Sequence, residues 1–245
     1  GEHKAAVEIL LQCHGGGLGK QAAVQAFLRN GDASEALRLL PKGFPVQEIM
    51  FKALKRNGND AFMEALRSLP HGTRSLFPQS YQSYVFNCMA TERLRRFGEK
   101  VVAGDLVLSG ESEQSESKRA RTAIQTRQGR VHVVSKAEVE AGKFTMQDVV
   151  LPMPGKNTAY PENEIRELYQ GKLAEDGIDI EDPTKNMTAF SNSLVGSYRK
   201  INEVANNVVF SLANEDGEKN LHISFDLAKG CYATCVLREL MKVAV

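Results

Sequence analysis

The sequence predicts an α+β fold, with helices in the first part of the chain and an antiparallel hairpin followed by a helix at its end. Over residues 5–70, apolar residues recur at three- to four-residue spacing, as in helices that bury one face. Residues 221–227 instead alternate apolar and polar side chains, which is the period of a strand with one buried face. Beyond Gly230 the apolar residues return to a helical spacing: Ala233, Val236, Leu237 and Leu240.

The helical first part is divided by turn-forming residues at 15–19, 30–31 and 41–45. The first of these runs, which leads into Lys20, has some of the glycines of a phosphate-binding loop. That loop requires Gly-x4-Gly-Lys followed by Ser or Thr after a strand. Here Gln21 follows the lysine and the preceding residues have a helical pattern, so we interpret the run as a flexible connection between helices.

A strong helix is predicted from about Ser80 to Phe97, and Gly98 ends it. The last turns of this helix are rich in cations, among them Arg93 and Arg96. Positive side chains suit the negative C-terminal end of a helix dipole, so a solvated helix end is one interpretation. Contact with a phosphate group is the other.

Two short strands are predicted at residues 101–108 and 131–134. Between them, residues 111–121 have no apolar periodicity, which predicts a disordered surface loop. Within that loop, Lys118–Arg121 is either a nuclear localisation signal or one of the short basic patches that many proteins carry.

Residues 151–155 contain two prolines and a glycine, which predict a stiff loop and exclude an interior strand or helix. The reason is that proline donates no backbone hydrogen bond and restricts the residue before it. A polar helix over 161–175 and a turn-rich acidic link over 176–183 follow. The chain then closes with the hairpin, whose loop we place at 214–220, and we expect the last helix to pack on it.

Composition bounds the class of protein. With 245 residues, 42% hydrophobic and 25% charged, the chain has the make-up of one or two soluble domains at roughly 150 residues per domain. No apolar run approaches the ~20 residues of a membrane span, and residues 1–4 lack the pattern of a signal peptide. We therefore expect a nuclear or cytoplasmic protein. A net charge of +1 gives no general attraction for a polyanion, so nucleic-acid binding would need a local basic face or further segments.

Cysteine and histidine usage gives little support for a metal site. None of the four cysteines forms a CxxC pair; Cys231 and Cys235 share a helix face, but no third and fourth ligand lies near them in sequence. The five histidines are scattered. Buried, reduced thiols are the expected state.

The end of the chain resembles the C-terminal motif of the TruD family of RNA pseudouridine synthases, through Phe225–Leu227, Tyr232–Thr234 and Leu237–Glu239. Further stretches agree in the order of the family: Ser80–Asn87 with Gly104–Val107, then Val149–Gly155 with Tyr160–Pro161, then Ser193–Ile201. The match extends over residues 70–240 and is closest to the eukaryotic Pus7-like branch. Residues 1–70 match more loosely.

The resemblance implies a division into three regions. Residues 1–70 would be a helical segment that links to an insertion domain. Residues 71–190 would be the mixed α/β TruD insertion domain. Residues 191–245 would be the C-terminal part of the catalytic domain and would complete part of its antiparallel pseudouridine-synthase sheet.

The resemblance also implies an activity, the isomerisation of uridine to pseudouridine in RNA, most of all tRNA, without a metal or an organic cofactor. In the family the nucleophilic aspartate lies in a Gly-x-Lys-Asp motif, and an Arg-Phe-Gly motif helps to build the pocket. We expect both upstream of Gly1 and absent from this chain, so that it contains no catalytic residue and is inactive alone. Asp105 and Asp226 match family positions other than the nucleophile. The expected partners are then RNA and, as a further candidate, the missing N-terminal half of the same protein. No membrane partner is expected.

Several side chains are candidates for contact with RNA. Tyr232 matches an aromatic that lines the uridine pocket in the family; the alternative is a core tyrosine at a strand–helix junction. Arg199 and Lys200 are candidates for the RNA backbone, because the planar fork of arginine suits phosphate, or they are simply exposed charges. Arg93 and Arg96 are candidates because the family presents this domain beside its RNA.

Other motif residues have expected structural roles. Gln82 and Asn87 could order facing loops by hydrogen bonds, and Asp105 belongs to a motif but not to the catalytic group. Arg238 and Glu239 face away from the apolar stripe, which favours an ion pair or an anchoring role. The aromatics of the Ser80–Asn87 motif are expected to fill the core of the insertion domain: Tyr81, Tyr84 and Phe86.

Two other readings remain. The chain could be a non-catalytic RNA-binding or scaffold relative that has lost the catalytic half. Alternatively, the motifs could mislead, and the chain would be an α+β interaction domain without affinity for RNA.

Overall fold

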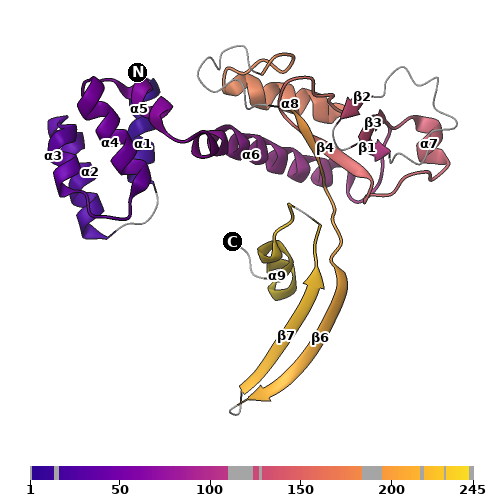
Figure 1. The fold of residues 1–245 in the computed structure, drawn as a ribbon. Coiled ribbons are helices and arrows are strands. Elements are labelled where there is room, and N and C mark those ends of the chain that lie inside the picture. Colours follow the sequence, from indigo (N-terminus) through magenta and orange to yellow (C-terminus); the bar gives the residue numbers. More distant parts are fainter. Residues whose placement is uncertain are drawn as a thin grey trace. The chain divides into compact units, whose positions relative to one another are not determined.

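The computed structural model describes residues 2–13, 17–109, 124–126, 129–183, 195–215, 218–228 and 230–242. These form a mixed α/β structure with antiparallel sheets (Figure 1). One compact unit extends to Gln82, and a second covers Ser83–Pro183 and Val195–Val245. The loop predicted at 111–121 lies outside the described residues. The boundaries at 70 and 190 stay predictions.

The first unit is helical, as predicted, and its helices end where the sequence has turn formers. They are α1 (Glu2–Gln12), α2 (Leu18–Asn30), α3 (Ala33–Leu39), α4 (Pro45–Asn57) and α5 (Phe62–Ser68). Gly31 ends α2 with a left-handed backbone, φ 67°, and its N–H donates to the carbonyl of Phe27. The Asp32 side chain then accepts from the first N–H groups of α3. The helix breaks predicted from glycine and proline are thus confirmed.

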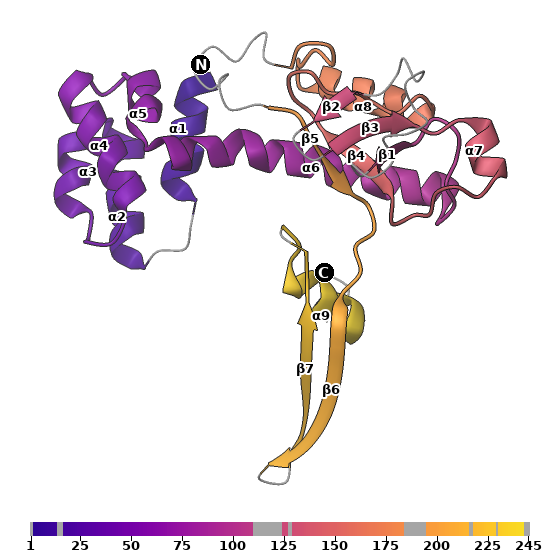
Figure 2. The ribbon, with the colours of Figure 1, turned by 45° about the vertical axis from the view of Figure 1, so that its right-hand side comes forward.

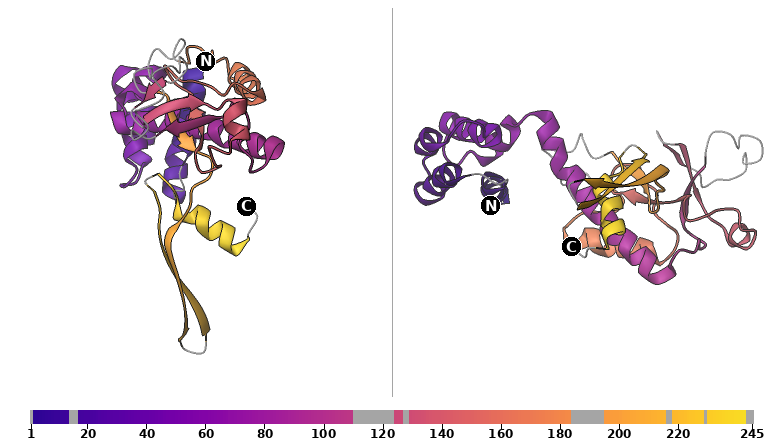
Figure 3. Two further views of the ribbon diagram at one scale, coloured as in Figure 1. Left: turned by 90° about the vertical axis from the view of Figure 1, so that its right-hand side faces the viewer. Right: turned by 90° about the horizontal axis from the view of Figure 1, so that it is seen from below.

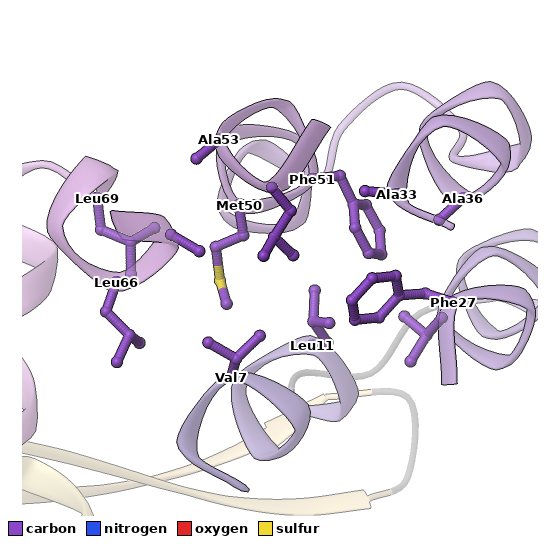
Figure 4. Close-up of a cluster of buried hydrophobic side chains, with 13 residues drawn as sticks. Val7, Leu11, Phe27, Ala33, Ala36, Met50, Phe51, Ala53, Leu66 and Leu69 are labelled. Atoms are coloured by element: carbon purple, nitrogen blue, oxygen red, sulfur yellow. The ribbon is translucent and has the colours of Figure 1, made fainter. Parts of the chain in front are cut away.

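The core of this unit lies between its helices. Figure 4 shows side chains from α1, α2, α3 and α4 pointing toward one another, with Phe27 and Phe51 edge to face at 5.4 Å between ring centroids. Lys20 is only 3% exposed, and its Nζ donates to the carbonyl of Cys13 at 2.6 Å, just beyond the end of α1. The lysine that suggested a phosphate-binding loop therefore caps the preceding helix.

Helix α6 (His71–Phe97) begins nine residues earlier than predicted. The added turns contain Pro78, although proline in a helix interior removes one backbone hydrogen bond and usually ends or kinks the helix. Here Pro78 is buried and the helix continues through it (Figure 2). Gly98 ends α6 as predicted, with φ 59° and its N–H bonded to the carbonyl of Leu94.

An antiparallel sheet of five strands, in the order β2-β3-β1-β4-β5, dominates residues 106–200. Its strands are β1 (Leu106–Ser109), β2 (Ile124–Thr126), β3 (Gly129–Val133), β4 (Val149–Met153) and β5 (Ser197–Lys200). Helices α7 (Lys136–Glu140) and α8 (Glu164–Glu175) lie in the same part of the chain, and α8 starts later than the predicted Pro161 because Asn163 caps it. One face buries Leu106, Val150 and Tyr198, and the other buries Val107 and Val149.

Strand β4 contradicts the prediction that residues 151–155 exclude an interior strand, because it lies between β1 and β5. Alternate residues of a strand direct their backbone groups to opposite neighbours. The Val149 carbonyl accepts from Ile201 on the β5 side, so Pro152 faces the β1 side. There the pairing with β1 ends at Val150, and the missing N–H therefore costs no ladder bond. The Pro152 carbonyl accepts from the Tyr169 hydroxyl at 2.7 Å instead.

The chain ends with the predicted hairpin and helix (Figure 3). Strands β6 (Asn206–Glu215) and β7 (Glu218–Asp226) are longer than predicted and reduce the connection to residues 216–217. On helix α9 (Ala233–Met241), Leu237 and Leu240 of the apolar stripe are 38% and 45% exposed, so the described residues cover this stripe only in part. Other large apolar side chains exposed here are Val208, Val209, Phe210, Leu212, Leu221 and Met241.

Candidate nucleic-acid interface

Two motif glycines hold the segment after β4 against the segment before β5. A Cβ placed on Gly155 would lie 2.3 Å from the backbone N of Gly196, so neither glycine has room for a side chain. Lys156 and Val195 form a parallel bridge at this point. The Thr158 hydroxyl closes the turn by donating to the carbonyl of Gly155 at 2.7 Å. The motif glycines thus fix where the chain enters β5.

A second glycine contact joins the start of β1 to the start of α8. Gly104 has φ +85°, and a Cβ there would lie 2.6 Å from the carbonyl carbon of Glu162. The N–H of Glu162 donates to the carbonyl of Gly104 at 2.8 Å. Asp105, the next residue, is 1% exposed and accepts from the Val102 N–H and from the Asn163 amide. Asp105 is therefore engaged by the turn before β1 and by the residue that caps α8.

Arg93 is buried, which contradicts its prediction as an RNA contact. Its side chain is fully enclosed; Nη2 donates to Asp105 Oδ2 at 2.7 Å and Nε to Oδ1 at 3.1 Å. Nη1 donates to the carbonyl of Gly98, and Nη2 also donates to that of Lys100. A guanidinium with these partners presents no charge to a phosphate. The arginine spacing at the end of α6 did not reveal this burial.

Arg199 remains a candidate. It lies on β5, opposite Leu151 of β4, and its guanidinium lies 5.1 Å from the centroid of the Phe86 ring of α6. No ion pair joins Arg199 to a carboxylate among the described residues. The neighbouring Tyr198 is anchored, because its hydroxyl accepts from the N–H of Ala159 at 2.6 Å. The half-buried guanidinium is thus held by an aromatic ring and keeps its charge available.

Lys200 points to the other face of the sheet from Arg199, since neighbouring residues of a strand alternate. Both are half-buried on β5, which is an edge strand. Both also act on Cys231, just before α9: burial raises the pKa of this thiol most, Glu203 raises it further, and Arg199 and Lys200 lower it. The two cations therefore lie on opposite faces of one edge strand, and the charge of each reaches the thiol that precedes α9.

Tyr232 is the residue that immediately precedes α9, and its side chain is 68% exposed. The described residues do not cover this ring, and both alternatives, a pocket tyrosine and a core tyrosine at a strand–helix junction, stay predictions for the full-length protein. The backbone carbonyl of Tyr232 accepts from the N–H of Cys235 at 3.0 Å, whereas its side chain makes no hydrogen bond or ring contact with another described residue. Its ring is free to meet a ligand or another segment of protein.

The helix motif Ser80–Asn87 divides between core and surface. Gln82 is buried, as an ordering role would require, whereas Asn87 is exposed and its backbone carbonyl accepts from the Thr91 hydroxyl. Phe86 is buried, but Tyr84 is exposed beside Lys172, at 5.4 Å, so the expectation that all its aromatics fill the core is wrong. The role of Phe86 beneath Arg199 was missed because the two lie on separate motifs.

Arg96 is partly exposed and pairs with Glu92 and Glu164, so part of its charge is already compensated. Contrary to the expectation, the tripeptide Arg-Phe-Gly does occur in the chain, at residues 96–98. There it forms the end of α6, after the Ser80–Asn87 motif. Arg238 and Glu239 are exposed on α9, and neither forms the expected ion pair with a described residue.

The described part of the chain contains neither a candidate metal site nor a candidate membrane-spanning helix. No group of three or more His, Cys, Asp or Glu side chains lies together there. None of the described helices has the length and apolar character needed to cross a bilayer.

Comparison with known proteins shows which family the chain resembles over most of its length. The family model described as tRNA pseudouridine synthase D (TruD) matches residues 1–240. The chain therefore belongs to the TruD family of pseudouridine synthases.

Among curated relatives, the Danio rerio protein named Pseudouridylate synthase PUS7L is 35% identical over 230 residues, which cover 90% of this chain and 34% of that protein. The Schizosaccharomyces pombe protein named Multisubstrate pseudouridine synthase 7 is 29% identical over 283 residues, covering 98% of this chain and 40% of that protein. The chain thus spans well under half the length of these relatives.

A crystal structure of a Methanosarcina mazei protein that carries the name tRNA pseudouridine synthase D (TruD) has the same fold, with a TM-score of 0.75 and 23% identity. The match covers 98% of this chain and 55% of that one. The TruD-like fold of the chain is thereby established.

Proposed function

We propose that the full-length protein containing this chain isomerises uridine to pseudouridine in RNA, most of all in tRNA. The bond from C1′ to N1 of the uracil breaks, and a bond from C1′ to C5 forms. The hydrogen on C5 leaves as a proton, and N1 takes up a proton, so the reaction needs no oxidant or reductant. The family match over residues 1–240 is the observation that carries this proposal.

The catalytic aspartate would come from outside these residues. Gly-x-Lys-Asp does not occur in the sequence, and Asp105 is committed to Arg93. Asp226 is exposed and accepts from the Asn207 amide at 2.7 Å. Because neither carboxylate lies in the expected context, we expect the 245-residue chain alone to be inactive.

The chain would contribute one side of the uridine site. A target uridine must leave its stack, at a cost of roughly a few kcal/mol, and flipped bases are commonly held against aromatic rings. The exposed ring of Tyr232 is suited to this, and its neighbour Cys231 is close enough to Arg199 and Lys200 for their charges to lower the pKa of its thiol. Arg199 and Lys200 would hold the RNA backbone beside it.

The rest of the protein would cover the exposed apolar surface of the hairpin and α9. A two-stranded hairpin is at best marginally stable in water, and apolar patches of this kind mark contact surfaces. Phe210, Leu212 and Leu240 are each exposed by 45% or more. The remaining catalytic domain is the occupant we propose, because relatives of this chain extend well beyond the part that it matches.

The test uses the full-length protein and a tRNA transcript carrying tritium on C5 of its uridines. Pseudouridine formation releases that tritium to water, and sequencing of the product locates the modified position. The proposal expects release by the full-length protein and none by residues 1–245 alone. Salt-dependent binding to the transcript without any release would instead support a non-catalytic RNA-binding or scaffold protein. Neither binding nor release would contradict both.

A further inference from the structure

Helix α6 places Phe86 and Arg93 on one buried face. The two residues are seven apart, about two helical turns, and Val85 and Met89 lie on the same face. All four side chains are at most 6% exposed. One end of this face carries the ring that supports Arg199, and the other end carries the buried guanidinium.

Arg93 ties this face to three other parts of the unit. Its guanidinium bonds Asp105 beside β1 and the carbonyls of the turn after α6. Asp105 in turn accepts from Asn163, the residue that caps α8. Apolar side chains alone would allow α6 to slide or rotate at little cost, because they tolerate repacking. A bidentate ion pair has one good geometry.

We propose that Arg93 is a positioning residue for RNA binding: its pair with Asp105 fixes the register of α6 that places Phe86 against Arg199. The buried pair thus selects one position of α6 more than it adds to the free energy of unfolding, a role that some buried ion pairs have. The proposal rests on the proposed function in one respect, the contact of Arg199 with RNA. Arg93 itself does not touch the RNA.

The experiment measures the affinity of the full-length protein for a tRNA transcript as a function of salt. The variants are Arg199→Ala, Asp105→Asn, and the combination of these two. We expect Asp105→Asn to weaken binding by the same factor as Arg199→Ala and to lower the salt slope by about 1, the effect of one lost phosphate contact. The combined variant should bind no more weakly than Arg199→Ala alone.

A second variant separates positioning from stability. Arg93→Met with Asp105→Leu replaces the ion pair by apolar side chains, a change that often keeps or raises stability. We expect this variant to stay folded and to bind RNA as weakly as Arg199→Ala; because the Gly98 carbonyl and the Val102 N–H lose side-chain partners, its melting temperature is compared with that of a destabilised control. A destabilised control, Val131→Ala in the core of the sheet, should keep wild-type affinity once it is folded.

Each outcome decides between the proposals. Wild-type affinity in the Met/Leu variant, or additive losses in the combined variant, would overturn the positioning role and leave the proposed function intact. Wild-type affinity in Arg199→Ala would overturn both the Arg199 contact and its positioning by Arg93, while tritium release would still report on the enzyme. Absence of release by the wild type, with these RNA effects present, would overturn only the catalytic proposal.

Discussion

Arg93 and Asp105 form an ion pair that water does not reach, with exposed fractions of 0% and 1% and a shortest distance of 2.7 Å. Each partner also bonds backbone groups, so that little of either charge is left uncompensated. Removing one partner of such a pair strands the other in a low-dielectric interior. The pair therefore joins α6, β1 and α8 into one cooperative unit.

Truncating this pair should be strongly destabilising. We expect Asp105→Ala to lower the free energy of unfolding by about 3–5 kcal/mol, the usual cost of an uncompensated buried charge. Arg95→Ala is the matched control, because Arg95 pairs with Glu92 on the surface, and it should change stability by less than about 1 kcal/mol. Hydrogen exchange of α6 and β1 in the full-length protein measures both. Equal protection in the two variants would contradict the role of the pair.

The contact between Gly155 and Gly196 predicts opposite effects of the same substitution at different glycines. Gly155→Ala would place a methyl group 2.3 Å from a backbone atom, so the β4–β5 region must shift and its unfolding temperature should fall. Gly171→Ala in α8 meets nothing within 4 Å, and it should stabilise by about 0.4–1 kcal/mol by restricting the unfolded chain. Thermal unfolding of both variants checks the sign, and a stabilising Gly155→Ala would show that the two segments are not locked together.

Glu138 predicts a pH dependence. Partial burial would raise the pKa of this carboxyl, but hydrogen bonds from Ser135 and His132 and the charge of His132 lower it overall, from 4.5 to about 2. A lowered pKa means that its contribution is complete above pH 4.5 and is lost as the pH falls toward about 2.

The comparison is between the wild type and Glu138→Gln, which keeps the shape of the side chain and removes its charge. We expect the wild type to melt at a higher temperature at neutral pH, with a difference that shrinks below pH 4.5. A difference that grew with acidity would mean that the carboxyl is protonated in the folded protein.

The surface of the hairpin and α9 predicts a contrast between two exposed leucines. In the full-length protein, Leu240→Asp should destabilise strongly, because it would bury a carboxylate against the remaining catalytic domain. Leu18→Asp, on the helical unit, should change stability by no more than about 0.5 kcal/mol, as surface substitutions usually do. Thermal unfolding distinguishes them, and equal melting temperatures would place Leu240 in solvent.

Local signals in the sequence were sufficient for much of the fold. Gly31 and Gly98 end helices with the left-handed backbone that their residue type allows, and the alternation of residues 221–227 does mark a strand. The prediction for residues 151–155 was wrong because a strand accepts a proline where the hydrogen-bond ladder to the neighbouring strand has already ended, as it has beside Pro152. That is a property of the folded sheet, which no local pattern contains.

The candidate site was less predictable, for a related reason. The burial of Arg93 depends on Asp105, twelve residues away, and the support of Arg199 by Phe86 joins two distant motifs. Residue type and spacing give the same pattern for a solvated arginine and for a buried one. The exposure of Tyr232 could be stated only as one of two alternatives, because a junction tyrosine can face either way.

We propose that this chain shapes the uridine site of an RNA pseudouridine synthase. The most direct measurement is tritium release by full-length protein carrying Tyr232→Ala, beside Tyr84→Ala as an exposed tyrosine on α6 that lies against Lys172 of α8. We predict that Tyr232→Ala loses most turnover while remaining folded and that Tyr84→Ala keeps it. Equal turnover of the two variants would contradict the claim.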